Sequence, residues 1–334
     1  MHRSIYMNDN VSLIDWISFS LPKRYQWGTG SIINSAPFEP ILNDLFNLST
    51  ESIEVSRNRA AFYADRYNIY DTNGRPLIVV YLNPTTTFSA ETSAVSINGY
   101  ALSKRNKLLR DLDPVQLIQK VDKHGGKLTR LDLALDIYDR PDLLDNIIEC
   151  CQVDCFKSRI KSRLRFDRPM VINFGESVYF NRRDDDTQLC FYRKDIQTGT
   201  ERPWTRLEFR TKNRKLLANI LNEITNGRPV GEITQKLLAD YISFYPPETD
   251  KYRNPPASWW REIVECGQPF EFRKHDEGKE DDEGGGQGSS SKKPRDCKTV
   301  IRYVNDALRF DTGEMLDKLL TDLQQRKVIQ DLVY

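Results

Sequence analysis

In the stretch Leu128-Thr-Arg-Leu-Asp-Leu-Ala-Leu-Asp136, leucine alternates with polar or small residues from Arg130 to Asp136. Two later stretches, Gln188-Leu-Cys-Phe-Tyr-Arg-Lys194 and Trp204-Thr-Arg-Leu-Glu-Phe-Arg210, show the same alternation. Patterning with a period of two predicts β-strands that have one apolar and one polar face. If the three strands share a sheet, two or three carboxylates, one phenol and several cations gather on one surface.

The remaining pattern predicts an α+β protein. Asn73-Gly74 indicates a hairpin turn, and Asp113-Pro114 and Gly125-Gly126 mark the start and stop of a helix. A further helix is expected over residues 232–244. Hairpin, strand and helix occur in that order twice, which indicates two similar halves.

Composition fits a globular protein without membrane segments. The 334 residues are 39% hydrophobic and 10% aromatic, enough for a sizeable core. No apolar run reaches the roughly 18 residues of a membrane helix, and the opening Met1-His-Arg-Ser lacks the apolar stretch of a secretory signal. We therefore expect a cytoplasmic location, with the six cysteines as free thiols.

Four regions are predicted along the chain. Residues 1–226 are expected to form the catalytic domain. Residues 227–274 are expected to form a helical and aromatic-rich extension, which is a candidate region for DNA specificity. Residues 275–296 contain no large apolar side chain and are expected to be a disordered linker. Residues 297–334 carry two amphipathic patterns and are expected to be a C-terminal helical segment, whose docking partner is left open.

Basic residues are concentrated between the two halves, although the formal net charge is only +1. Five of them, from Lys157 to Arg165, fall on alternate positions and would form a cationic ridge along an extended segment. A solvated edge strand explains the same pattern equally well. The residues expected to contact DNA are Lys157, Arg159, Lys161, Arg163, Arg165, Arg182, Arg183, Arg206 and Arg210.

The polar faces of the three strands offer oxygen ligands for a hard divalent ion such as Mg²⁺ or Mn²⁺. Asp132 and Glu208 are the natural pair, because neighbouring strands lie about 4.8 Å apart. Asp136 ranks second, since it lies about 13 Å from Asp132 along an unbroken strand. Ordinary exposed carboxylates paired with Arg130, Arg206 or Arg210 are an equally good interpretation.

Tyr192 is the candidate nucleophile on this surface. A phenol has a pKa of about 10 and needs a cation or a metal-bound base to react at neutral pH. Lys194, two residues further along the predicted strand, would supply the cation. A tyrosine in a strand usually only packs or forms hydrogen bonds, so the hypothesis depends on Tyr192, Asp132 and Glu208 occurring together.

Other chemistries find little support. The three histidines lie far apart in sequence, so a metal site based on paired histidines is excluded. Cys150, Cys151 and Cys155 lack a second cluster to complete a tetrahedral zinc site. The absence of a Gly-x-x-x-x-Gly-Lys-Ser/Thr loop argues against an intrinsic ATPase or helicase.

Several motifs resemble those of the trans-acting replication initiation factors of rolling-circle plasmids and filamentous phages, a family that includes relaxases of conjugative elements. They are Ile14-Asp-Trp-Ile-Ser-Phe-Ser20, the Leu128–Asp136 block, Val178-Tyr-Phe-Asn-Arg-Arg183 with the block ending at Lys194, and the Trp204–Arg210 block. The resemblance spans roughly residues 10–225. It implies a curved, mostly antiparallel sheet with helices packed on one side.

The resemblance also implies a chemistry. The tyrosine matched by Tyr192 cleaves one strand at an origin, keeps the 5′ phosphate as a phosphotyrosine and leaves a 3′ hydroxyl for a polymerase. Asp132 and Glu208, with Asp136, match the acidic residues of the divalent-metal site. Expected partners are origin DNA as duplex and exposed single strand, a host helicase and DNA polymerase in a bacterial cytoplasm, and a second copy of the chain.

Two alternatives stay open at this point. One is a relaxase of a conjugative element, which uses the same chemistry. The other is a DNA-binding regulator without catalysis, because plasmid members carry a further Glu on the preceding strand and the corresponding strand here reads Ala94-Val-Ser-Ile-Asn98.

Overall fold

A single large sheet forms the centre of the computed structural model. The structure describes residues 10–22, 38–48, 53–85 without 59, 61 and 72, 92–103, 106–160, 171–173, 177–265 without 184, 248–250 and 252, and 271–272. All described elements belong to one compact unit, Met1–Gly278. The predicted linker and C-terminal helical segment lie outside the described residues, and the predicted domain boundaries stay predictions.

The strand order of the sheet is β2-β3-β4-β5-β1-β6-β11-β10-β9-β8, with β13 beside β1. Neighbours in this order pair antiparallel, and β13 pairs parallel with β1. The strands are β1 (Val11–Pro22), β2 (Glu54–Asn58), β3 (Tyr63–Tyr70), β4 (Pro76–Pro84), β5 (Thr92–Asn98), β6 (Lys127–Tyr138), β8 (Val171–Asn173), β9 (Ser177–Phe180), β10 (Thr187–Arg193), β11 (Trp204–Thr211) and β13 (Glu271–Phe272). A second, two-stranded sheet pairs β7 (Phe156–Ser158) with β12 (Ile242–Phe244).

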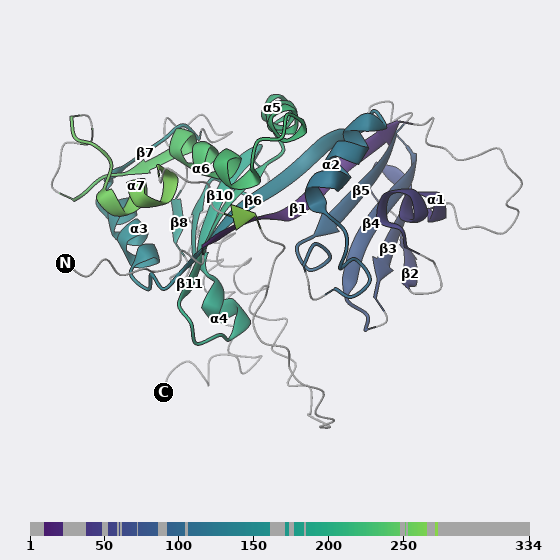
Figure 1. Cartoon of the computed structure of the whole chain (residues 1–334), viewed down its shortest axis with the longest axis horizontal. Coiled ribbons are helices and arrows are strands. Elements are labelled where there is room, and N and C mark those ends of the chain that lie inside the picture. The colour runs from purple at the N-terminus through teal and green to yellow at the C-terminus, as the bar shows by residue number, and fades with distance from the viewer. Residues whose placement is uncertain are drawn as a thin grey trace, which may run out of the picture. The chain divides into compact units, whose positions relative to one another are not determined.

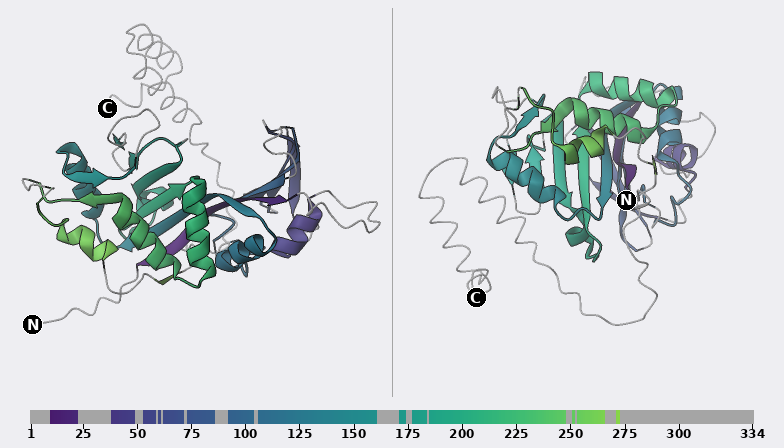
Figure 2. Two further views of the ribbon diagram at one scale, coloured as in Figure 1. Left: turned by 90° about the horizontal axis from the view of Figure 1, so that it is seen from above. Right: turned by 60° about the vertical axis from the view of Figure 1, so that its left-hand side comes forward.

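The two longest strands, β1 and β6, lie side by side at the centre of the sheet (Figure 2). On one side of this pair β5, β4 and β3 follow in order, and on the other side β11, β10 and β9 do. Each of these three-strand groups leads into a helix, α2 (Pro114–Lys123) or α5 (Arg214–Thr225). The predicted repetition of hairpin, strand and helix is therefore present in the topology.

Helices α2, α5 and α6 (Val230–Tyr241) cover one side of the sheet (Figure 1). Their apolar positions pack on the face that carries Leu131, Leu133 and Leu135 of β6. The remaining helical elements are α1 (Glu39–Ile41), the π-helical turn η2 (Leu42–Phe46), α3 (Leu143–Gln152), α4 (Lys194–Thr198) and α7 (Ser258–Val264). The expected α+β fold, an antiparallel sheet with helices on one side, is confirmed.

Local sequence signals account for several boundaries. Gly74 in the predicted hairpin turn has φ +70°, a conformation that glycine adopts without steric cost. The Asp113 side chain accepts hydrogen bonds from the backbone N–H groups of Val115 and Gln116, which caps the start of α2. The helix predicted over 232–244 instead ends at Tyr241, because residues 242–244 pair with β7 as strand β12.

Candidate functional site

Strands β6, β11 and β10 turn their polar residues to the face opposite the helices. Arg210 of β11 lies opposite Asp132 of β6, and Arg206 lies opposite Asp136. Tyr192 of β10 lies opposite Arg206. Residues directly opposite in an antiparallel pair project to the same side. We call this surface the polar face; it comprises Asp132, Asp136, Gln188, Cys190, Tyr192, Arg206, Glu208 and Arg210.

Tyr192 and Glu208 are in direct contact on the polar face. The phenol oxygen of Tyr192 donates a hydrogen bond of 2.6 Å to Oε1 of Glu208. The other carboxylate oxygen of Glu208 accepts a hydrogen bond of 2.6 Å from Nε of Arg210. Glu208 is only 1% exposed, so this network lies below the surface of the sheet. The sequence prediction that Tyr192 and Glu208 meet agrees with this geometry.

The two aspartates of β6 are each held by an arginine. Asp132 accepts hydrogen bonds of 2.9 Å and 2.5 Å from Arg130, and Nε of Arg210 lies 3.8 Å from it. Asp136 accepts hydrogen bonds of 2.6 Å and 2.8 Å from Arg206. Such bidentate pairs fix the orientation of both partners. Asp132 therefore belongs to the group around Arg210 and Glu208, whereas Asp136 is bound to Arg206.

A fourth carboxylate, Asp15, reaches the same region from β1. The pairing of β1 with β6 shifts by one residue between Ile14 and Trp16, and such a β-bulge turns the extra residue out of the regular alternation. Oδ1 of Asp15 accepts a hydrogen bond of 2.7 Å from Nη1 of Arg206. Asp15 lies in the Ile14–Ser20 motif, but the sequence alone assigns it no role in the site, because a bulge cannot be read from periodicity.

Lys194 contributes a cation, although from a different element than expected. Strand β10 ends at Arg193, and Lys194 is the first residue of α4. Its ammonium nitrogen lies 5.8 Å from the centre of the Tyr192 ring and donates a hydrogen bond of 3.0 Å to Gln197. The Lys194 ammonium group thus lies over the face of the Tyr192 ring. The sequence had predicted that the two side chains would be neighbours on one strand.

The electrostatics of the polar face keep Tyr192 neutral. Burial, and next the negative charge of Glu208, raise the pKa of Tyr192 well above its ordinary value. Burial opposes ionisation of Glu208 as well, but the charges of Arg210 and Arg206 hold its pKa below the usual range. Burial and the charge of Glu208 raise the pKa of Asp15 to about 6. A further positive charge near these acids would favour ionisation of the phenol.

The donor set suits a hard divalent ion. Asp15, Asp132 and Glu208 offer carboxylate oxygens, and their mutual repulsion contributes to the raised pKa values of Asp15 and Asp132. Within the described residues, no three acidic, histidine or cysteine side chains are already grouped to bind one ion. Binding would require Arg130 and Arg210 to release their carboxylates. Both arginine side chains retain some exposure, 19% and 23%.

The residues predicted to contact DNA separate into four groups. Arg206 is 0% exposed and forms ion pairs with Asp136 and Asp15. It therefore has the surroundings of a structural cation, whereas the sequence predicted a residue that contacts DNA. Lys157 lies on β7, outside the large sheet, with Nζ 5.0 Å from the centre of the Tyr245 ring, and Arg159 follows it. Lys161, Arg163 and Arg165 lie outside the described residues. Arg183 and Arg210 line a pocket at the end of the polar face, and Arg182 precedes Arg183 in the turn between β9 and β10.

A sequence model described as "Replication initiation factor" matches residues 126–281. The match contains β6, β10 and β11, and with them Asp132, Tyr192 and Glu208. Residues 126–281, a little under half of the chain, are therefore similar to the replication initiation factor family.

Two further proteins are similar to parts of this chain or to its fold. The "Putative DNA relaxase NicK" of Bacillus subtilis (strain 168) is 26% identical over 136 residues, which are 36% of this chain and 38% of the relative. The match thus spans well under half the length of that relative. A solved structure, the rolling circle replication initiator protein from Geobacillus stearothermophilus, has the same fold. It is 22% identical, with a TM-score of 0.62 over 80% of this chain and 100% of that chain.

Within the described residues, no helix has the length and apolarity needed to cross a membrane.

Proposed function

We propose that this protein nicks one strand of DNA at a replication origin and transfers the cut end to Tyr192. The observation that carries the proposal is the hydrogen bond of 2.6 Å between Tyr192 and Glu208, with Asp132 and Asp15 beside them. A phenol and three acids on a sheet surface provide a nucleophile, a proton acceptor and oxygen ligands. The family of residues 126–281 supports this assignment.

The proposed reaction balances as a phosphoryl transfer. The Tyr192 oxygen attacks the scissile phosphorus, and its proton passes to Glu208, which accepts its hydrogen bond. The bond between phosphorus and the 3′ oxygen breaks, and that oxygen takes a proton from water. The 5′ phosphate stays joined to Tyr192, so the phosphodiester energy is kept for a later transfer.

The carboxylates would hold Mg²⁺ or Mn²⁺, with Asp132 and Glu208 as ligands and Asp15 as the third. Asp136 is a less suitable ligand because Arg206 occupies both of its oxygens. A bound divalent ion would offset the acidic charge around the phenol and withdraw electrons from the scissile phosphate. Lys194, over the Tyr192 ring, would stabilise the phenolate.

The test mixes the purified protein with supercoiled DNA of the replicon that encodes it, with Mg²⁺ or Mn²⁺. We expect a protein–DNA adduct that survives sodium dodecyl sulfate, and its loss when a chelator removes the ion. Tyr192→Phe should abolish the adduct and spare DNA binding. Tyr179→Phe is the matched control, because Tyr179 lies opposite Cys190, one strand further along.

Each alternative outcome has a clear meaning. An undiminished adduct with Tyr192→Phe would contradict the role of Tyr192. Binding to DNA without a nick under any metal condition would support the regulator without catalysis. A nick at a transfer origin rather than a replication origin would identify a relaxase, a possibility favoured by the similarity to NicK.

A further inference from the structure

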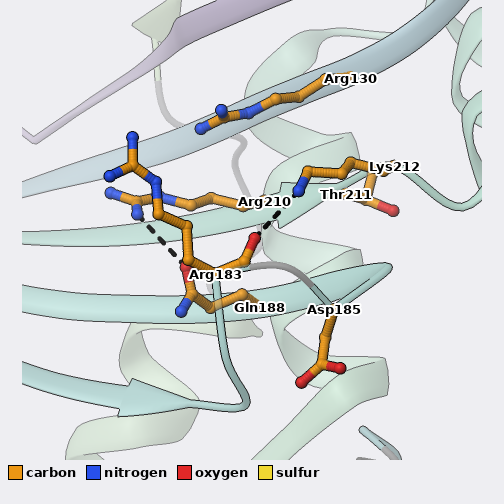
Figure 3. A pocket seen from close by; sticks show the side chains of 7 residues that line it. All are labelled: Arg130, Arg183, Asp185, Gln188, Arg210, Thr211 and Lys212. Carbon is orange, nitrogen blue, oxygen red and sulfur yellow. Dashed lines mark hydrogen bonds between the residues drawn. The ribbon is translucent and has the colours of Figure 1, made fainter. Parts of the chain in front are cut away.

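A cationic pocket lies at the end of the polar face, beyond Glu208 and Asp132. Arg130 of β6 and Arg210 of β11 line it on the sheet, and Gln188 of β10 lies between them and the β9–β10 turn. Arg183 in that turn and Lys212 after β11 complete the basic lining, and Asp185 is the acidic residue. Figure 3 shows the guanidinium groups of Arg130, Arg183 and Arg210 directed to the same side of the pocket.

Contacts among the described residues hold the pocket in shape and give the Arg183 side chain no carboxylate partner. Nζ of Lys212 donates a hydrogen bond of 3.0 Å to the backbone oxygen of Arg183, which ties the turn to the end of β11. Asp185 accepts a hydrogen bond of 2.9 Å from the backbone N–H of Arg182 and points away from the guanidinium groups (Figure 3). Among the described residues, no ion pair involves the exposed Arg183 side chain.

Three like charges at one place repel each other, and an anion between them relieves the repulsion. Arginine forks suit a phosphate in particular, because parallel N–H groups match its oxygens. Arg130 and Arg210 also form ion pairs with acids of the polar face, Asp132 and Glu208 respectively. The pocket is therefore linked to the acids of the site through shared arginines.

The pocket is separate from the point at which Tyr192 would attack. Gln188 lies four residues before Tyr192 on β10, which corresponds to about 13 Å along a strand. One DNA strand advances about 3.4 Å per nucleotide when stacked, so about four linkages cover that distance and fewer do if the strand is stretched. A phosphate in the pocket is thus a neighbour of the scissile phosphate and cannot be that phosphate itself.

We propose that this pocket binds a second backbone phosphate of the cleaved strand, within about four linkages of the scissile bond. The inference rests on the proposed nicking function and adds a positioning contact to it. Arg183 supplies the new contact. Arg130 and Arg210 bind the same phosphate when they release Asp132 and Glu208, which couples strand binding to exposure of the acids.

The experiment places a single uncharged methylphosphonate at successive linkages of an origin oligonucleotide. With the wild-type protein we expect about a tenfold loss of affinity at one non-scissile linkage within four of the cut, equivalent to about 1.4 kcal/mol. Arg183→Gln should bind the unmodified DNA about tenfold more weakly and show no further loss at that linkage. Its log–log salt slope should fall by about 0.7 to 0.9.

Lys123→Gln is the control, because Lys123 is exposed at the end of α2, on the helix-covered side of the sheet. It should match the wild type at every linkage. Equal sensitivity of wild type and Arg183→Gln to each linkage would overturn the pocket.

Every protein in this affinity experiment, including the reference called wild type, also carries Tyr192→Phe, so that no DNA is cleaved during the measurement. If the protein with Tyr192 intact forms no adduct but Arg183→Gln still lowers the affinity for DNA, only the nicking proposal is contradicted. If the protein with Tyr192 intact forms a normal adduct and Arg183→Gln does not change the affinity for DNA, only the proposed phosphate pocket is contradicted.

Discussion

Asp15 and Asp136 bind different nitrogens of the same guanidinium, that of Arg206. Asp136 takes Nε and Nη2 at 2.6 Å and 2.8 Å, and Asp15 takes Nη1 at 2.7 Å. One buried arginine therefore joins β1, β6 and β11 across the centre of the sheet. A lysine has one nitrogen and cannot make this set of contacts.

Arg206→Lys should consequently destabilise the protein by about 3 kcal/mol, within the range for breaking a buried ion pair. Denaturant unfolding measures the change. Arg202→Lys is the matched control: Arg202 also pairs with an aspartate, Asp139, but both side chains are exposed, 45% and 59%. An exposed pair contributes less than about 1 kcal/mol. Equal losses in the two variants would contradict the structural role of Arg206.

Asp15 should make folding stability depend on pH. Its pKa is raised from 3.8 to about 6, so the folded protein holds a proton that the unfolded chain has released between these values. Stability from this group is present at low pH and is lost as pH rises through about 6. The difference corresponds to about 3 kcal/mol.

Without divalent ions, the unfolding free energy of Asp15→Asn relative to wild type should therefore improve between pH 4 and pH 6.5, by up to about that amount. Urea titrations at several pH values give the measurement. A constant difference across this range would show that Asp15 does not titrate there.

Gly99 leaves the room that Asp15 occupies. A Cβ atom at position 99 would lie 2.7 Å from Oδ1 and 3.0 Å from the backbone oxygen of Asp15. Gly99→Ala should cost about 1 to 3 kcal/mol through steric overlap and should slow adduct formation by moving Asp15.

Gly74→Ala is the control that separates a loss of stability from a displacement of Asp15. Position 74 has open space but φ +70°, so alanine there costs about 1 kcal/mol by backbone strain, far from the site. At temperatures where Gly99→Ala and Gly74→Ala both stay folded, we expect Gly74→Ala to form the adduct at the wild-type rate. A normal rate for Gly99→Ala would remove Asp15 from the site.

Glu208→Gln tests the charge that faces Tyr192. Glutamine still accepts a hydrogen bond but is neutral, so the pKa of Tyr192 should fall, while adduct formation should slow by about 100-fold or more because the proton acceptor is gone. Tyrosinate absorbance, with Tyr192→Phe as reference, reports the pKa. Glu223→Gln, on α5 and paired with Lys236 and Arg228, should change neither quantity.

The sequence predicts the sheet well because its strands have one apolar and one polar face. Alternation in 128–136, 188–194 and 204–210 places Asp132, Tyr192 and Glu208 on one face, and the strand pairing brings them together. Motif signals such as Asp113-Pro114 also fix helix starts.

The remaining features depend on contacts between distant segments. Asp15 reaches the site through a bulge that exists only when β1 is paired with β6. Lys194 leaves the strand pattern because α4 begins there, and the arginine partners of each acid depend on register between strands. None of these follows from local periodicity.

The central place of β1 has a consequence for how the protein is made. Its first residues pair with Asp136 and its last with Thr92, so both neighbours are synthesised long after it. Contacts so far apart in sequence make folding slow. During translation, residues 11–22 must wait for β5 until residue 98 has left the ribosome, and for β6 until residue 138 has left it. A chaperone that shields this apolar segment should therefore raise the yield of active protein.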